Sequence, residues 1–258
     1  PGGIVQKLGV STATVGVNTA QLFTVRGLDP QGHDLGDLTS SATFTISGTG
    51  GSCTANSCRA NSVGVRTVTA TVGGVTGTAT LDVRQRQTIS FTAISTKTML
   101  QSPVTAVATA TSTLSVTFTS TTPAVCTAGG TNGATITLVA AGSCSVQATP
   151  AGDATWAPAV PVTRTFTVNR ANQTITSTSP GNQTITASPI TVSGSASSGL
   201  PVSFTTTTPA VCTAGGPDGS SITLLDAGTC SVRAEQPGDT RYNPANAVTR
   251  NFTVTKVT

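Results

Sequence analysis

Six cysteines are the residues whose number and spacing indicate chemistry most clearly. Cys126 and Cys144 are 18 positions apart, Cys212 and Cys230 are also 18 apart, and Cys53 and Cys58 are five apart. No pair has the Cys-x-x-Cys spacing of a metal site, and no Lys or His flanks a cysteine to activate a thiolate. We therefore expect structural disulfides of an oxidising compartment, with redox chemistry as the weaker alternative. The expected pairs are 53–58, 126–144 and 212–230.

The acidic residues and the single histidine offer little to catalysis. The chain has nine Asp and Glu residues and one His, so no Ser/His/Asp set is plausible, and the acids fall in turn sequences rather than in a glycosidase-like pair. We expect no enzymatic activity and no cofactor. The sequence around His33 could offer carboxylates to Ca²⁺, although its spacing matches no known calcium loop and an ordinary polar loop is the favoured interpretation. The candidate calcium ligands are Asp29, Asp34 and Asp37.

The chain contains one module twice. Shifting the sequence by 86 positions aligns residues 87–172 with 173–258 without a gap, and about half of the paired positions are identical. A repeat of this length fits one small β-sandwich domain and is too long for a solenoid unit. We predict three domains, residues 1–86, 87–172 and 173–258, the first of them divergent.

Short runs of Val, Thr, Ile and Phe recur between Gly, Pro, Asn and Asp, which is the pattern of an all-β sandwich. In the second domain this predicts strands at 87–92, 104–111, 115–120, 124–128, 135–140, 143–149 and 162–169. In the first domain it predicts strands at 10–16, 20–28, 41–47, 57–61, 65–72 and 75–84. Gly73-Gly74 predicts a two-residue hairpin turn. The predicted fold class is three tandem immunoglobulin-like β-sandwiches, and the very short linkers predict an extended rod.

The only Trp and the only Tyr occupy the same position of the two copies. Trp156 and Tyr242 lie in the matching runs 152–159 and 238–245. We interpret both as packing residues that close one end of each sandwich, with a polar tip at the rim. The alternative is an exposed binding platform.

The composition argues against a nucleic-acid partner and against a transmembrane helix. Charged residues make up 9% of the chain, against about a quarter in average proteins, and the net charge of +4 forms no run of Lys or Arg. With 3% aromatic residues, we expect no nucleic-acid partner. No apolar run is long enough for a transmembrane helix. A weak attraction to acidic cell-wall polymers or membrane surfaces stays open.

Several motifs together resemble bacterial immunoglobulin-like repeats of large secreted and surface proteins. They include the opening Gln-Thr-Ile at 173–175 and the runs 200–204, 209–212, 227–232, 238–242 and 252–254. The first domain resembles this family more distantly, through residues 36–40, its Cys pair and its Thr-Val-Thr-Ala-Thr strand. The resemblance implies stalks, spacers or adhesive modules on the cell surface, and no shared catalytic residues.

We expect a non-enzymatic, structural segment of an exported bacterial surface or adhesin-type protein, outside the cell and without membrane insertion. One alternative is an adhesive module for a surface glycan or protein, with Trp156 and Tyr242 as candidate binding residues. Another is a subunit of an extracellular filament or phage particle that pairs with other copies of itself.

Overall fold

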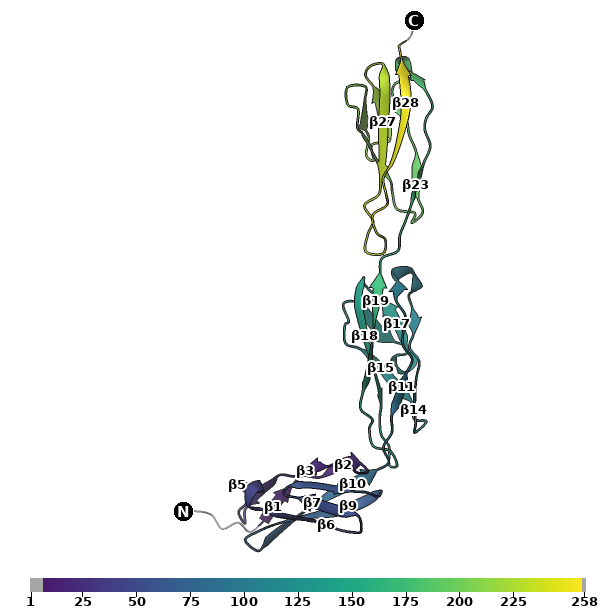
Figure 1. Cartoon of the computed structure of the whole chain (residues 1–258). Coiled ribbons are helices and arrows are strands. Elements are labelled where there is room, and N and C mark those ends of the chain that lie inside the picture. The colour runs from purple at the N-terminus through teal and green to yellow at the C-terminus, as the bar shows by residue number, and fades with distance from the viewer. Residues whose placement is uncertain (1–6, 257–258) are drawn as a thin grey trace.

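The structure is a computed structural model that describes residues 7–256, and it is all-β as predicted (Figure 1). The regular elements in this range are strands and four short 3₁₀ helices of three residues each. No helix in this range combines the length and the apolar character needed to cross a bilayer. We refer to residues 7–86, 87–172 and 173–256 as the first, second and third segments.

The second segment is a sandwich of a four-stranded and a three-stranded sheet. The larger sheet has the order β12-β19-β18-β15, the smaller one has the order β13-β17-β16, and β11 pairs with β14. The elements are β11 (Ile89–Phe91), β12 (Lys97–Thr98), η2 (Met99–Gln101), β13 (Val104–Thr105), β14 (Ala108–Ala110), β15 (Val116–Ser120), β16 (Cys126–Gly129), η3 (Thr131–Gly133), β17 (Thr135–Leu138), β18 (Gly142–Pro150) and β19 (Val162–Asn169).

The third segment repeats this arrangement strand for strand. Its sheets have the orders β21-β28-β27-β24 and β22-β26-β25, and β20 pairs with β23. The elements are β20 (Ile175–Ser177), β21 (Gln183–Thr184), η4 (Ile185–Ala187), β22 (Ile190–Thr191), β23 (Gly194–Ala196), β24 (Ser203–Thr206), β25 (Cys212–Gly215), β26 (Ser221–Leu224), β27 (Gly228–Glu235) and β28 (Val248–Thr255).

The first segment keeps the four-stranded sheet and changes the rest. The order β2-β10-β9-β6 corresponds to β12-β19-β18-β15, with the same parallel pairing of an early strand with the last one. Two three-stranded sheets, β1-β4-β5 and β3-β8-β7, complete it. The elements are β1 (Lys7–Val10), β2 (Ala13–Gly16), β3 (Gln21–Leu22), β4 (Val25–Leu28), β5 (Asp34–Asp37), η1 (Thr39–Ser41), β6 (Thr43–Ile46), β7 (Gly51–Thr54), β8 (Ser57–Ala60), β9 (Gly64–Val72) and β10 (Val75–Arg84).

The cores form because buried apolar residues alternate with polar residues along the strands. In β18 the side chains of Cys144, Val146 and Ala148 are fully buried, while the residues between them are polar and lie on the other face, as the two-residue period of a strand requires. The rings of Phe91 and Phe118 pack at a centroid distance of 5.4 Å. Among the described residues, each cluster of buried side chains stays within one segment.

Three predicted strands are each divided between two sheets. The predicted strand 20–28 breaks into β3, which pairs with β8, and β4, which pairs with β1. The predicted strand 104–111 breaks after Thr105, because β13 bonds to β17 in the smaller sheet whereas β14 bonds to β11. The predicted strand 10–16 breaks between β1, which pairs with β4, and β2, which pairs with β10. The hairpin at Gly73-Gly74 is confirmed, because Val72 pairs with Val75 and both glycines have positive φ, 58° and 86°.

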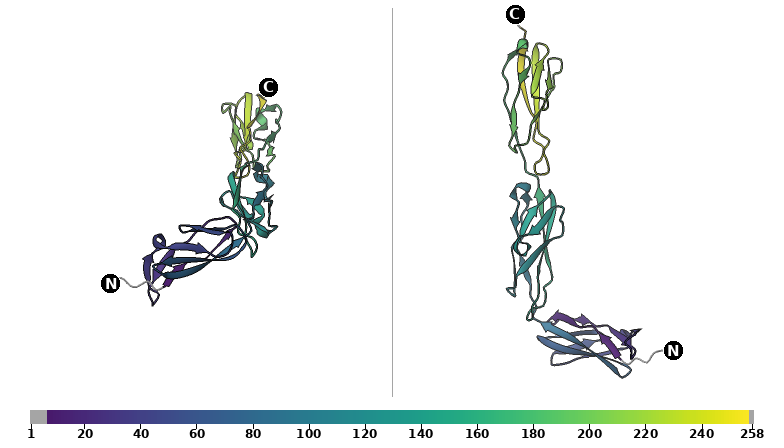
Figure 2. Two further views of the ribbon diagram at one scale, coloured as in Figure 1. Left: turned by 60° about the horizontal axis from the view of Figure 1, so that its bottom comes forward. Right: turned by 180° about the vertical axis from the view of Figure 1, so that it is seen from behind.

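The three segments follow one another as an extended chain with one bend. The second and third segments lie in line, and the first is turned aside where β10 leads into the second (Figures 1 and 2). The bend therefore falls at the first junction, after β10, and the straight part of the chain begins after it.

Candidate functional site

The second and third segments each carry a loop that the first lacks. It joins the last two strands of the larger sheet and covers residues 151–161 between β18 and β19, and residues 236–247 between β27 and β28. At the same place the first segment has only the Gly73-Gly74 turn between β9 and β10. We call residues 151–161 and 236–247 the receiving loops, because each binds the chain that enters its segment.

An aspartate folds each receiving loop. One carboxylate oxygen of Asp153 accepts the backbone N–H groups of Thr155 (2.8 Å) and Trp156 (2.7 Å), and the Asp153 N–H donates to the Trp156 carbonyl. Asp239 binds Arg241 and Tyr242 in the same way. Such side-chain-to-backbone bonds are the usual mechanism by which Asp specifies a turn.

The residue before each of these aspartates must be glycine, because a side chain there would clash with the loop backbone. A Cβ on Gly152 would lie 2.4 Å from the Trp156 carbonyl oxygen, and one on Gly238 would lie 2.4 Å from that of Tyr242. The Gly-Asp pair is therefore the sequence signal of the loop.

The receiving loop holds the incoming chain by a short parallel β-bridge. At the first junction, Gln85 N–H donates to the Thr155 carbonyl at 2.8 Å, and Ala157 N–H donates to the Gln85 carbonyl at 2.9 Å. At the second junction Ala171 makes the same two bonds, both 2.8 Å, with Arg241 and Asn243. The two bridges are related by the 86-residue repeat, so the same pair of backbone bonds holds the chain at both junctions.

A buried glutamine anchors each junction two residues later. Gln87 is 6% exposed; its amide N–H₂ donates to the carbonyls of Ala151 (3.2 Å) and Ala157 (2.9 Å), and its carbonyl accepts the Ser112 hydroxyl. Gln173 is equally buried and bonds to Gln236, Asn243 and Ser198. A buried amide must satisfy its polar atoms, and here it does so by tying the first strand to the receiving loop. The sequence shows this Gln at the start of both copies without indicating that it is buried.

Trp156 and Tyr242 lie in the receiving loops and are half-buried. Their backbones take part in the junction, since Trp156 forms the bridge with Gln85 and Tyr242 the bridge with Ala171. The sequence motif around them thus belongs to a connection between segments, a role that sequence reasoning missed.

Each segment contains one disulfide. Cys126–Cys144 and Cys212–Cys230 each join the smaller sheet to the larger one, through β16 to β18 and through β25 to β27. These bridges connect the two sheets, although no Trp stands between the paired cysteines in the sequence. Cys53–Cys58 instead links facing residues of the β7–β8 hairpin.

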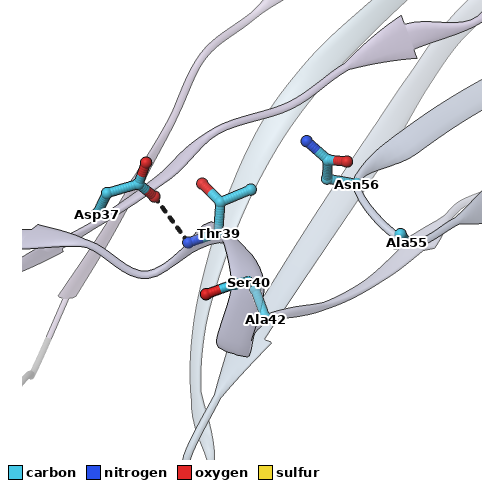
Figure 3. A pocket seen from close by; sticks show the side chains of 6 residues that line it. All are labelled: Asp37, Thr39, Ser40, Ala42, Ala55 and Asn56. Atoms are coloured by element: carbon cyan, nitrogen blue, oxygen red, sulfur yellow. Dashed lines mark hydrogen bonds between the residues drawn. The ribbon is translucent and has the colours of Figure 1, made fainter.

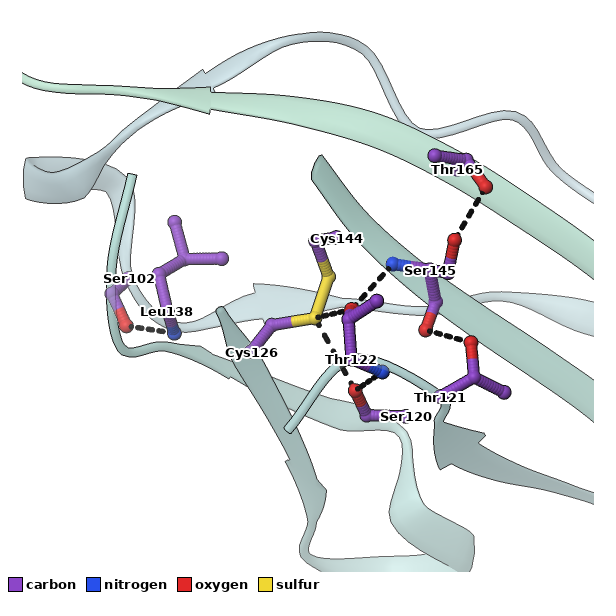
Figure 4. Close-up of a disulfide and its surroundings, with 9 residues drawn as sticks. All are labelled: Ser102, Ser120, Thr121, Thr122, Cys126, Leu138, Cys144, Ser145 and Thr165. Carbon is purple, nitrogen blue, oxygen red and sulfur yellow. Dashed lines mark hydrogen bonds between the residues drawn. A yellow bond between two sulfur atoms is a disulfide. The ribbon is translucent and has the colours of Figure 1, made fainter. Parts of the chain in front are cut away.

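Hydroxyl groups surround the second-segment disulfide (Figure 4). The Thr122 side chain lies against the sulfur of Cys126 and accepts the backbone N–H of Ser145 at 2.9 Å. Ser120 lies on the same sulfur and accepts the Thr122 N–H. These bonds fix the turn that leads into β16, so the environment of the disulfide is structural.

Each of the three candidate calcium ligands binds a different protein partner. Asp29 accepts bonds from the backbone and ring of His33, Asp34 pairs with Arg26, and Asp37 accepts the Thr39 N–H at 2.8 Å. Residues 34–37 form β5 rather than part of the predicted loop. Within residues 7–256, no group of three or more His, Cys, Asp or Glu side chains is placed to hold a metal ion.

The electrostatics of this region follow from those contacts. The side-chain hydrogen bond from Arg26 lowers the pKa of Asp34, and the hydrogen bonds from Thr39 lower the pKa of Asp37. Desolvation opposes ionisation of Asp29, but the bonds from His33, Gln31 and Gly32 together leave its pKa lowered. Hydrogen bonds from the protein thus stabilise all three carboxylates as anions.

A hollow of about 380 Å³ lies beside Asp37 (Figure 3). Several of its polar groups are bonded to the protein. Asp37 binds Thr39, the Thr39 hydroxyl accepts the Val25 N–H, and Asn56 donates to the Phe23 carbonyl. We assign no ligand to this hollow.

No family profile and no curated protein matches this sequence. Solved structures with a similar arrangement include Drosophila N-cadherin EC1-4, with 12% identity, a TM-score of 0.33, and coverage of 98% of this chain and 76% of that one. Domains 1–6 of the surface layer protein SbsC match at 16% identity and a TM-score of 0.32, covering 98% of this chain and 40% of that one. Titin domains I67–I69 match at 9% identity and a TM-score of 0.34, covering 97% of each chain. Likeness at this level carries no conclusion about function, and the immunoglobulin-like class rests on the sheets described above.

Proposed function

We propose that this chain is a non-enzymatic spacer of an exported bacterial surface or adhesin-type protein. It would consist of three immunoglobulin-like domains, residues 1–86, 87–172 and 173–258, each with one disulfide and related to bacterial immunoglobulin-like repeats. The observation that carries the proposal is the β-bridge that recurs at both junctions. A flexible display chain would need no such contact, whereas a spacer that holds distance must fix the angle between neighbours.

The junctions are short as well as bonded. Only Gln85 and Arg86 separate the end of β10 from the buried Gln87, and Gln85 is bonded through both of its backbone groups. Each backbone hydrogen bond contributes about 1 kcal/mol, and the buried glutamine removes further freedom two residues on. Few rotatable bonds stay free between one sandwich and the next.

Several carboxylates in residues 7–256 have partners that serve the fold, which supports a structural role. The carboxylates of Asp153 and Asp239 fold the receiving loops, and those of Asp34 and Asp82 pair with arginines. The three disulfides fit an oxidising compartment outside the cytosol. The partner of such a segment would be a surface glycan, another protein or another copy of the chain.

Distance measurement between paired spin labels tests the fixed angle. Cysteine-free labelling chemistry at Thr119 and Thr205, exposed and equivalent positions of the second and third segments, should give a single narrow distance distribution. Asp239→Ala removes the two bonds that fold the second receiving loop, and we expect it to broaden the distribution.

The matched control is Asp218→Ala. Asp218 folds a different turn of the third segment by binding Ser220 and lies outside the receiving loop, so the distribution should stay narrow. A broad distribution in the unmodified chain, or equal broadening by both variants, would overturn the spacer proposal.

A further inference from the structure

The second junction has a polar hollow of about 720 Å³ between the end of the second segment and the receiving loop of the third. It is lined from the second-segment side by the ends of β12 and β19 and by the linker, and from the other side by Asn243. Its hydrogen-bonding side chains come from six residues, which are Thr98, Thr167, Asn169, Arg170, Asn172 and Asn243.

Two of the three amides at this hollow, those of Asn172 and Asn243, are bonded to each other and keep free polar atoms. Asn243 donates from its side-chain nitrogen to the side-chain carbonyl of Asn172 at 2.9 Å, which joins the two sides of the junction. Among the described residues, the Asn172 N–H₂ group and the side-chain carbonyl of Asn243 have no protein partner beyond this bond. One donor group and one acceptor are therefore available at fixed positions.

The hollow has a positive charge that no carboxylate balances. Its lining includes Arg170 and no Asp or Glu, and none of the ion pairs within residues 7–256 involves Arg170. Arg170 is exposed, so its guanidinium is accessible. A guanidinium with free N–H groups favours planar anions such as carboxylate and phosphate.

The first junction supplies an internal contrast. Arg84 stands at the position equivalent to Arg170, one residue before the bridge, but it binds Asp82 at 2.6 and 2.8 Å and also donates to the Asp153 carbonyl. The position of Asn243 is taken by Ala157, and that of Asn169 by Val83. The hollow at the first junction is accordingly lined in large part by apolar residues, although Arg86 contributes a charge.

We propose that the hollow at the second junction binds an anionic polyol, such as an acidic sugar or a polyol phosphate. Arg170 would bind the anion, and the amides and hydroxyls around it would bind the neighbouring hydroxyl groups. Without an aromatic ring to stack on a sugar, single-site affinity is expected to be weak, in the range of about 0.1–1 mM. The site rests on the proposed function, because its two sides come together only if the junction is held. A ligand bound there would attach the spacer to an acidic surface polymer.

Titration of the isotope-labelled full chain, followed by amide chemical shifts, tests this site. The probes are trigalacturonate, glycerol 3-phosphate and the neutral maltotriose. Arg170→Gln should weaken binding of the anionic probe about tenfold, the usual effect of losing a charge-assisted hydrogen bond. Asn169→Val, which copies the first junction, should weaken it about threefold.

The matched control is Arg241→Gln, since Arg241 is exposed on the same junction but does not line the hollow. It removes the same charge and should change affinity less than about twofold, as expected for a screened charge outside the site. Thermal melting of each variant establishes that it is folded.

Saturable binding of either anionic probe that depends on Arg170 supports the proposal, and which of the two probes binds identifies the carboxylate or the phosphate source. Equal losses in Arg170→Gln and Arg241→Gln would show a diffuse charge effect and overturn it. So would maltotriose binding as tightly as trigalacturonate, or no saturation by any probe below about 10 mM. A narrow spin-label distribution without binding rejects this site alone, whereas a broad one rejects the spacer.

Discussion

The first segment and the two repeats share a four-stranded sheet and differ in the turn that joins its last two strands. In the first segment β9 and β10 meet through Gly73-Gly74, and in the repeats an eleven- or twelve-residue receiving loop stands there, at residues 151–161 and 236–247. The first segment folds around its sheets without such a loop, and in the repeats the loop adds the ability to hold a preceding neighbour. Connection and stability are therefore encoded in separate parts of the same module.

The largest expected effect tests whether the segments unfold independently. Phe166 and Phe252 are equivalent core residues, each 4% exposed, and replacing either by Ala should destabilise its own segment by about 3–5 kcal/mol. In calorimetry, each variant should shift a different transition. If Phe252→Ala lowers all transitions together, the segments form one cooperative unit and the comparison between them fails.

The disulfides should differ in effect between the two kinds of segment. Replacing Cys126 and Cys144 together by Ala opens a loop with a sequence separation of 18, and replacing Cys53 and Cys58 opens one of five. The chain-entropy estimate gives losses of about 3 and about 2 kcal/mol respectively. Denaturant unfolding of the two double variants measures the difference, and a larger loss at the Cys53–Cys58 hairpin would contradict this ranking.

The smallest expected effect is the response to acid. The pKa of Asp34 is lowered by Arg26 and that of Asp37 by Thr39. Their folded pKa lies below the unfolded value of about 3.9, so their stabilisation is present above that pH and is lost as the pH falls through the lowered pKa. The second segment has a single carboxylate, Asp153.

Melting curves recorded between about pH 5 and pH 2 check this expectation, since the range spans the titration of the carboxylates. The transition of the first segment should move most, and that of the second should move least. Asn replacement of Asp34 should reduce the pH dependence of the first segment and leave the other two unchanged. A second segment that is the most acid-sensitive would contradict it.

Sequence reasoning found the elements that depend on local pattern. The alternation in residues 143–149 and the glycines at 73 and 74 report on neighbours along the chain, and the structure has β18 and the β9–β10 turn there. It could not find that residues 104–111 change sheets, because this depends on which strand lies alongside. The short strands β5, β7 and β12 were missed for the same reason.

The junction shows a similar limit. The Gly-Asp pair and the Trp or Tyr that follows were visible as shared features of the two copies. Nothing in that pattern indicates that the loop bonds to Gln85 or Ala171, because the contact joins residues 70 or more positions apart. The buried Gln87 and Gln173 were equally hidden, since an amide at the start of a strand usually faces water.

The cystine of each repeat has a mechanical consequence for a chain under tension. If a repeat is pulled open from its ends, the residues between Cys126 and Cys144 stay enclosed in a covalent ring and cannot straighten. With a separation of 18 residues, about 60 Å of contour length is withheld at roughly 3.4 Å per residue. A stretched chain would thus lengthen in shorter steps when oxidised than when reduced, and stay closer to whatever it is attached to.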